Sequence, residues 1–427
     1  MRVRTILIIG VLVREVFSFW TGHPFDFEIW VRTGYWVARG LSPYASIPLA
    51  PGLSFANDFG GPGLNPAVGY LPFWPLLLGA IYELYALGGS GNRFAYYFML
   101  KQPIIFADVL LAFLLFLYVK RWNPGRAPQV MALWLFSPFT IILSGIWGIF
   151  DSMAMVFVIL GILAPSGRAR SVWEGIAIFV KSIPIIFIIP VSLSRENLRE
   201  KKVLNFVIAL GIPVFFTVLV VYLAGWPWLR PPGATGAVLT TLTSTLPKRG
   251  FPLSLWGTLL YLNTLNVIPN SMVSSIFGWA GYIWIPAVVI ASLLGFRWFG
   301  FGTDRGVIQS MLVVTLVFLL LRGQVNEQYA VYLLSLLLID AAIWSPKRMR
   351  LFYAVSVVIV VATVTNNFLL IRFLTPIYPN ALQLEAQLIG EVSSIRNALQ
   401  YVEGLSFSGL NIWYLAALIK ERRRPAP

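Results

Sequence analysis

The chain has 427 residues, of which 58% are hydrophobic and only 11% are charged, and its mean hydropathy is +0.77. Soluble domains carry about 25% charged residues, so the composition excludes an ordinary soluble enzyme and predicts an all-α polytopic membrane protein. The net charge of +15 comes from Lys and Arg in short gaps between apolar runs, a pattern that orients membrane proteins and does not indicate nucleic-acid binding. The absence of Cys excludes disulfides and a thiolate nucleophile, and the single His excludes a multi-histidine metal site.

Apolar runs recur along the whole chain. A helix needs about 20 apolar residues to cross the hydrocarbon core, and shorter helices can do so inside a bundle. No small-residue cleavage site follows the first run, so we expect it to remain as a span. With one further crossing allowed, the pattern predicts a bundle of about 11 membrane segments. The clear runs are 5–20, 99–119, 130–146, 150–164, 203–224, 274–295, 306–321, 329–344, 351–371 and 405–419.

The run 68–87 is ambiguous, and the loop that follows the next span decides how we interpret it. A full crossing here would place Lys120 and Arg121 outside, although basic loops favour the cytoplasm. The run also contains Pro72 and Pro75, which disfavour a helix interior. We therefore expect a broken interfacial element in the outer leaflet.

The run 172–193 is ambiguous for the same reason. One crossing would place Lys201 and Lys202 outside, and Lys181 and Pro184 lie near its centre. Irregular backbone at membrane depth is tolerated where it lines a cavity. We therefore expect a bent hairpin that returns to the cytoplasm.

With these two choices, the short basic loops and the basic tail fall on the cytoplasmic side, and so do both termini. The long outer segments are then 21–98, 225–273 and 372–404. No repeat or linker divides the chain, so we expect residues 1–427 to form a single membrane-embedded domain with a long first extracytoplasmic loop.

Four polar clusters stand near the outer boundary, where ionisable groups are costly and usually face a cavity. We expect all four to converge on one outward-facing cavity. They are Asp26 with Glu28 after the first span, Asp151 in the turn 144–152, Lys181 in the bent hairpin, and Arg322, Glu327 and Gln328 in the turn 322–329.

Each cluster also has a purely structural interpretation. Asp26 and Asp151 are both placed to cap the helix that follows them. Buried charges commonly pair with each other or bond free carbonyl groups. On this basis Glu327 would pair with Arg322, Lys181 would bond carbonyls at the helix break, and Asp108, within the run 99–119, would be a buried structural partner.

The motifs together resemble the GT-C superfamily of multispan glycosyltransferases that use polyprenyl-phosphate-linked sugars. The resemblance covers most of residues 5–345, and its motifs come in the same order as in that superfamily. Two positions depart from the pattern. Pro24 stands where GPI-type mannosyltransferases have the first Asp of an Asp-x-Asp pair, and Ile149 stands where bacterial and archaeal mannosyltransferase-like members have the glutamine of a Trp-Gly-Gln-Phe-Asp-Ser turn. The matching segments are Asp26-Phe27-Glu28 through Gly40-Leu41-Ser42-Pro43-Tyr44, Ser144 to Ser152, Val180-Lys181-Ser182-Ile183-Pro184, and Asn326-Glu327-Gln328-Tyr329.

This resemblance implies an inverting transferase that moves a hexose, mannose or glucose, from a polyprenyl phosphate to a lipid-linked glycan or glycolipid. Asp26 would be the general base at the outer face of a prokaryotic plasma membrane. No cofactor is implied, although a divalent metal and a partner subunit both stay open. Residues 5–345, including the outer loop 21–98, would be the catalytic module, and 346–427 would add C-terminal segments. The implied substrate contacts are Glu28, Asp151, Lys181, Arg322, Glu327 and Gln328, with Arg32 and Arg39 behind them.

Two other functions stay open. A polymerase or ligase of lipid-linked glycans would use the same donor chemistry. A secondary transporter could use Lys181 and Asp108 for coupling, although such proteins usually contain two repeated halves, which we do not find.

Overall fold

The computed structural model describes residues 2–44, 50, 53, 68–88, 91–194, 198–228, 253–264 and 266–421. Within these ranges the chain is helical and forms no strand, as the composition predicts. The basic tail after Glu421 and parts of the segments 21–98 and 225–273, which the sequence predicts to be outside, are not among the described residues.

The helices follow one another along the chain with short connections. In chain order they are α1 Val3–Ser18, α2 Pro24–Val37, α3 Phe73–Leu87, α4 Arg93–Trp122, α5 Ala127–Leu135, α6 Pro138–Ile141, η2 Ile142–Trp147, α7 Asp151–Leu163, α8 Gly167–Val180, η3 Ile183–Phe187, α9 Ile188–Ser192, α10 Arg199–Leu223, α12 Leu255–Thr264, α13 Asn270–Phe299, α14 Asp304–Leu321, η4 Glu327–Tyr329, α15 Ala330–Ile343, η5 Pro346–Arg348, α16 Met349–Asn366, η6 Phe368–Leu374 and α17 Ala381–Glu421.

Six helices in the described part of the chain are long and apolar enough to cross a membrane, and a bent pair makes a seventh candidate. Helices α1, α7 and α15 are shorter, with 16, 13 and 14 residues. Multiple membrane spans are therefore supported, whereas the expected count of about 11 is not confirmed. The six are Arg93–Trp122, Arg199–Leu223, Gly281–Phe299, Asp304–Leu321, Pro346–Asn366 and Ala381–Glu421.

The two ambiguous runs adopt different structures. Helix α3 is continuous over 15 residues, so the expected break in this run is wrong. Pro72 is its N-cap and Pro75 lies in its first turn, where a missing N–H costs no helical hydrogen bond. In the second run, α8 ends before Lys181, and Pro184 starts η3. Helices α8 and α9 then pack together, which confirms the bend, while the return of the hairpin to the cytoplasmic side stays a prediction.

The apolar run at 130–146 is bent. Helices α5 and α6 are separated at Ser137–Pro138, and the two halves of the pair meet at 50°. The second half continues into the π-helix η2, which ends at Gly148 in the left-handed conformation, with φ of 86°. The bend and the π-helix carry this segment to the outer turn where the second polar cluster lies.

A buried ion pair connects this bent segment to the rest of the bundle. Arg14 of α1 pairs with Asp108 of α4 at 2.7 Å, and both side chains are essentially unexposed. Ser144 of η2 donates to Asp108 at 3.0 Å, while Trp134 and Ser152 donate to its other oxygen at 3.0 and 2.8 Å. Because every donor comes from a different element, this cluster fixes η2 relative to α1, α4, α5 and α7.

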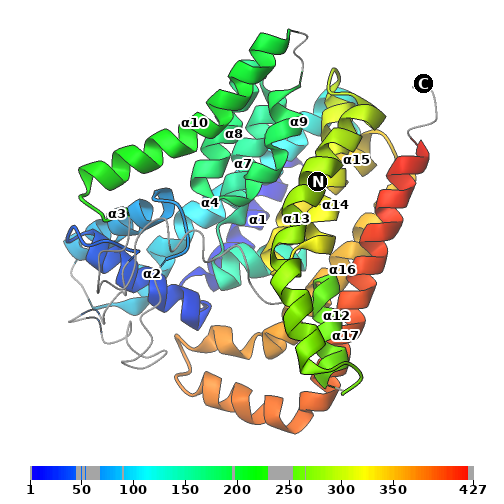
Figure 1. Ribbon diagram of the computed structural model, residues 1–427. Helices are drawn as coiled ribbons and strands as arrows, with labels where there is room; N and C mark the ends of the chain where they lie inside the picture. The colour runs from blue at the N-terminus through cyan, green and yellow to red at the C-terminus, as the bar shows by residue number, and fades with distance from the viewer. Residues whose placement is uncertain are drawn as a thin grey trace.

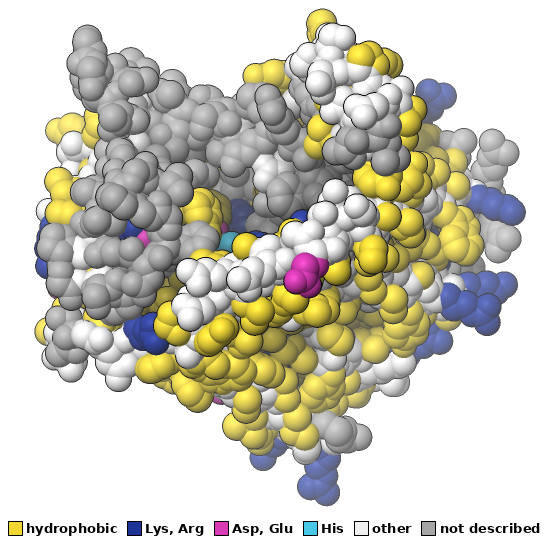
Figure 2. Space-filling model, turned by 90° about the horizontal axis from the view of Figure 1, so that it is seen from below, with side chains coloured by type: hydrophobic (Ala, Val, Ile, Leu, Met, Phe, Trp, Pro, Cys, Tyr) yellow, Lys and Arg dark blue, Asp and Glu magenta, His cyan; other side chains and the backbone are white. Residues whose placement is uncertain are grey.

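Figure 1 shows α2 and α3 lying side by side next to the bundle, and α16 and α17 side by side on its other flank. The segment η6 and the first part of α17 lie at the end of the molecule opposite the C-terminus. Viewed from that end, the surface is hollowed, and basic and histidine side chains are visible in the hollow (Figure 2).

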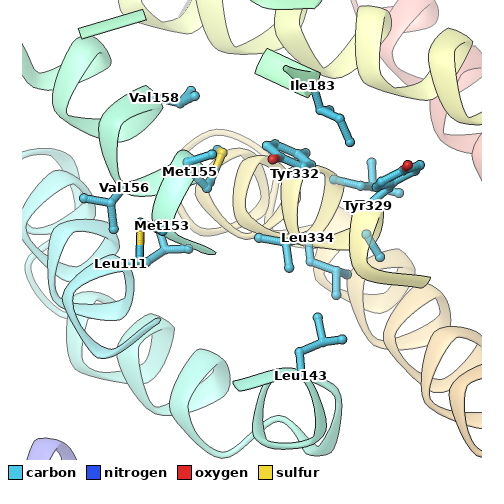
Figure 3. Packing of buried hydrophobic residues seen from close by; sticks show 14 of the residues in the cluster. Leu111, Leu143, Met153, Met155, Val156, Val158, Ile183, Tyr329, Tyr332 and Leu334 are labelled. Carbon is cyan, nitrogen blue, oxygen red and sulfur yellow. The ribbon is translucent and has the colours of Figure 1, made fainter. Parts of the chain in front are cut away.

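The apolar core lies directly beneath this end. Met155 of α7, Ile183 of η3 and Tyr332 of α15 converge in it, as Figure 3 shows. Each of these side chains is at most 6% exposed. The short helices around the hollow are therefore positioned by packing as well as by their own hydrogen bonds.

Candidate active site

A cavity of about 690 Å³ occupies the hollow end of the bundle. The four segments that carry the polar clusters all contribute to its lining, as expected from the sequence, although Glu28 and Asp151 themselves do not line it. The lining residues include the start of α2, the turn after η2, the break after α8, the loop after α14 and the end of α16 with η6. Of the expected site residues, Asp26, Lys181, Arg322, Glu327 and Gln328 line it.

Asp26 is the third residue of α2 and lies at the cavity surface, with its side chain 21% exposed. The indole N–H of Trp147 donates to its Oδ2 at 2.8 Å. The positive end of the helix dipole also favours a carboxylate here. The cap of α2 is made by His23 and not by Asp26, so the structural interpretation of Asp26 as a cap is wrong.

The turn that carries Trp147 requires glycine at position 148. At its φ of 86°, a Cβ on Gly148 would lie 2.7 Å from the ring of Phe27, the residue after Asp26. The backbone N–H of Gly148 and that of Ile149 both donate to the Leu143 carbonyl, at 2.8 and 2.9 Å. Glycine therefore allows the tryptophan turn and the start of α2 to pack closely.

Lys101 of α4 also holds this turn, a role that could not be predicted from the sequence. Its fully buried ammonium bonds Thr21 O at 2.6 Å, Gly145 O at 2.7 Å and Ile146 O at 3.0 Å. A cation suits these carbonyls because those of Gly145 and Ile146 lie at the C-terminal end of η2, and that of Thr21 follows the C-terminal end of α1. Lys101 thus fixes the distance between the segments that carry Asp26 and Trp147.

Lys181 forms a buried ion pair with Asp151, the first residue of α7. Its ammonium lies 4.6 Å from the centre of the Phe150 ring. Asp151 makes no capping hydrogen bond and does not line the cavity, so both structural interpretations, a capping Asp151 and a carbonyl-bonded Lys181, are replaced by this pair. A fixed positive group is thereby held at the cavity wall.

Arg322 follows α14 and is surrounded by aromatic rings. Its guanidinium carbon lies 5.5 Å from the ring centre of Trp284, 5.1 Å from Phe318 and 5.1 Å from Tyr329. Across the described ranges no carboxylate pairs with it, and the expected pair with Glu327 is not formed. Arg322 is thus a cation that lines the cavity, is stabilised by ring faces and is left available for an anion.

Glu327 bonds to another helix instead. Asn366, at the end of α16, donates to its Oε1. Burial raises the pKa of the Glu327 carboxyl, although the Asn366 hydrogen bond and Arg372 oppose the shift, so the protonated, donating form becomes easier to reach. Its neighbour Gln328 has a buried Oε1 without a protein partner. Both groups suit sugar hydroxyls, which donate and accept.

Glu28 is not brought to the cavity. It pairs with Arg32 one helical turn further along α2, and the two side chains are 6% and 2% exposed. Asp108 is the buried structural partner that the sequence suggested, which leaves it engaged by Arg14 and away from the cavity. The described residues bring no three His, Asp or Glu side chains together in a metal-binding arrangement.

The cavity also uses residues beyond 345, which sequence reasoning did not identify as part of the site. Arg372 of η6 lines it and pairs with Glu385 of α17 at 2.7 Å. Phe373 packs against Trp147, with ring centres 5.6 Å apart. Three consecutive residues with positive φ, at 368–370, turn the chain here. Neither the pairing nor the turn has a local sequence signal, because η6 reaches the site only through the tertiary fold. The other lining residues from this part are Asn366, Asn367 and Leu382.

The chain has a distant similarity to a curated mannosyltransferase. Over 265 residues it is 23% identical to GPI mannosyltransferase 1 of Eremothecium gossypii. This stretch is 59% of the present chain and 63% of that protein, so the chain spans less than two thirds of its relative's length. No protein-family model matches the chain.

Proposed function

We propose that this protein is a membrane glycosyltransferase that moves a hexose, mannose or glucose, from a polyprenyl-phosphate carrier to a hydroxyl of a lipid-linked glycan or glycolipid. The distant similarity to a GPI mannosyltransferase and the helical membrane architecture support a mannosyl-transferring enzyme in general. The observation that carries the finer proposal is one cavity in which, among the described residues, Asp26 has no cationic partner and Arg322 has no carboxylate partner.

Asp26 is the general base in this proposal. It removes the proton of the acceptor hydroxyl as that oxygen attacks C1 of the donor sugar. The bond between C1 and the phosphate oxygen breaks, the phosphate leaves with the electron pair, and the anomeric centre inverts. Phosphate is already a good leaving group, so one carboxylate suffices, in contrast to glycoside hydrolysis, which needs two.

Arg322 and Lys181 hold the donor phosphate. A polyprenyl-phosphate sugar is a phosphodiester with one negative charge, and the lipid phosphate left after transfer gains a second. Arg322 offers an uncompensated charge for this anion, while Lys181 offers hydrogen bonds from an ammonium whose charge is balanced by Asp151. Glu327 and Gln328 orient sugar hydroxyls. Glu28 and Asp151 support these groups and do not contact substrate.

The test uses purified protein in detergent with radiolabelled polyprenyl-phosphate mannose or glucose and a lipid extract from the source cells. We expect label to move to a glycan or lipid, and Asp26→Asn to lower the rate by at least about 100-fold, the usual contribution of a general base. Glu83→Gln, the same change at an exposed position on α3, is the matched control and keeps full activity.

Transfer that survives Asp26→Asn would disprove the base assignment and leave the transferase proposal intact. If the folded wild-type protein transfers neither sugar, the proposed donor class is wrong.

A further inference from the structure

His23 is the only histidine of the chain and lies next to Asp26 in the cavity wall. Its ring stacks on Trp147, with centres 5.1 Å apart and planes 21° from parallel, and it contacts Phe373 at 5.6 Å. The side chain is only 12% exposed. Two rings from elements far apart in the sequence therefore fix the orientation of the imidazole.

The hydrogen bonds of His23 determine which nitrogen carries the proton. Its Nδ1 accepts the backbone N–H of Asp26 at 3.3 Å and so caps α2. A nitrogen that accepts must have a free lone pair, so the neutral ring carries its proton on Nε2. The same Nδ1 also lies 3.3 Å from Oδ2 of Asp26, but it could bond that oxygen only by gaining a proton and losing the cap.

The Nε2 atom has no hydrogen-bond partner among the described residues, and it is not fully buried. It therefore reaches the cavity. We infer that His23 is held as the neutral Nε2–H tautomer and donates this N–H to an oxygen of the acceptor beside the hydroxyl that Asp26 deprotonates. The tautomer follows from the geometry alone, whereas the acceptor contact rests on the proposed function.

The neutral form of His23 preserves the basicity of Asp26. A cation next to a carboxylate lowers its affinity for a proton, so an imidazolium at this position would weaken the base. Burial is the main cause that lowers the pKa of His23 from 6.5 to about 4; Asp26 raises it and Arg372 lowers it further. With the opposing effects of Asp26 and Arg372 taken into account, the pKa of His23 lies well below 7, and the ring stays neutral at physiological pH.

Because His23 is the only histidine, ¹³C,¹⁵N-histidine labelling of the full chain, purified with a tag that lacks histidine, gives an NMR spectrum with a single imidazole. We expect an unprotonated Nδ1 and a protonated Nε2 between pH 5 and 8, with titration only near pH 4. An Nδ1–H tautomer, or an imidazolium at pH 6 to 7, would overturn the inference without any reference to activity.

The acceptor contact is tested with His23→Asn, which keeps a capping oxygen but lacks a donor at the position of Nε2. We expect the KM for the acceptor extract to rise about fivefold to tenfold, the factor that one neutral hydrogen bond provides, with the KM for polyprenyl-phosphate mannose unchanged. A change in the donor KM alone would refute the contact. If wild type transfers no sugar but shows the Nε2–H tautomer, the proposed function fails and the tautomer stands.

Discussion

At the scale of single residues, the charges of the cavity divide into compensated and uncompensated groups. Lys181 and Arg372 each have a carboxylate partner, Asp151 and Glu385. Among the described residues, Asp26 accepts a hydrogen bond from the neutral indole of Trp147, Glu327 accepts one from the neutral amide of Asn366, and Arg322 is contacted by ring faces. Of these groups, Asp26 would take up an incoming proton and Arg322 an incoming anion in the proposed reaction.

Removing Lys181 should destabilise the fold as well as the reaction. Lys181→Met leaves Asp151 buried without its cation, which typically costs about 3–5 kcal/mol, and we expect a lower midpoint of thermal unfolding in detergent. The double variant with Asp151→Leu should regain much of that midpoint but not the transfer activity. Recovery of full activity in the double variant would show that Lys181 has no role toward the donor.

Arg322→Gln removes the charge while keeping much of the side-chain length. A hydrogen bond to a charged group contributes about 1.5–3 kcal/mol, so we expect the donor KM to rise about tenfold to hundredfold and the acceptor KM to stay the same. Lys347→Gln, at an exposed position in η5, is the matched loss of one positive charge and should change neither. Steady-state transfer, measured once at varied donor concentration and once at varied acceptor concentration, gives the two KM values.

At the scale of elements, short and irregular pieces position the site. The π-helix η2 ends in the tryptophan turn, η3 follows the break at Lys181, and η6 brings Phe373 onto that turn. Long helices supply the frame, whereas these pieces set side-chain direction. The proposed base is different, because Asp26 lies in the first turn of a regular helix, α2.

Gly148→Ala tests the role of the tryptophan turn. A left-handed conformation costs a non-glycine residue about 1–2 kcal/mol, and the added Cβ would meet Phe27 at 2.7 Å. We expect a lower unfolding midpoint and a transfer rate reduced at least tenfold because Trp147 moves away from Asp26. Gly211→Ala, inside α10 with open space around it, is the control and should lower neither the midpoint nor the rate, since alanine is the better helix former.

At the scale of the whole molecule, orientation in the membrane is a prediction that the native sequence makes easy to test, because the chain contains no cysteine. Single cysteines at exposed Asn380, after η6, and exposed Gly302, between α13 and α14, should react differently with an impermeant maleimide. We expect labelling of Asn380→Cys in intact cells and of Gly302→Cys only after lysis. The reverse pattern would place the cavity on the cytoplasmic side.

The sequence predicted the parts of the molecule that follow from local chemistry. Hydropathy predicted a bundle of apolar helices, and Pro184 marked the break after Lys181, whereas the sides of the membrane assigned to the loops from their charge stay a prediction. The break expected at Pro75 was wrong, because proline in a first helical turn removes no hydrogen bond. The roles of Lys101 and Arg372 could not be predicted, since their partners lie on other elements and only the tertiary fold brings them together.

The same long-range contacts determine when the cavity can form during synthesis of the chain. His23 and Asp26 emerge early from the ribosome, but the residues that hold them, Lys101, Trp147 and Phe373, follow over the next several hundred positions. The wall around Asp26 therefore stays incomplete while most of the chain is inserted into the membrane. A nascent chain stalled before η6 would carry His23, Asp26 and Trp147 but would lack Arg372 and Phe373, so the cavity can form only when most of the chain has been made.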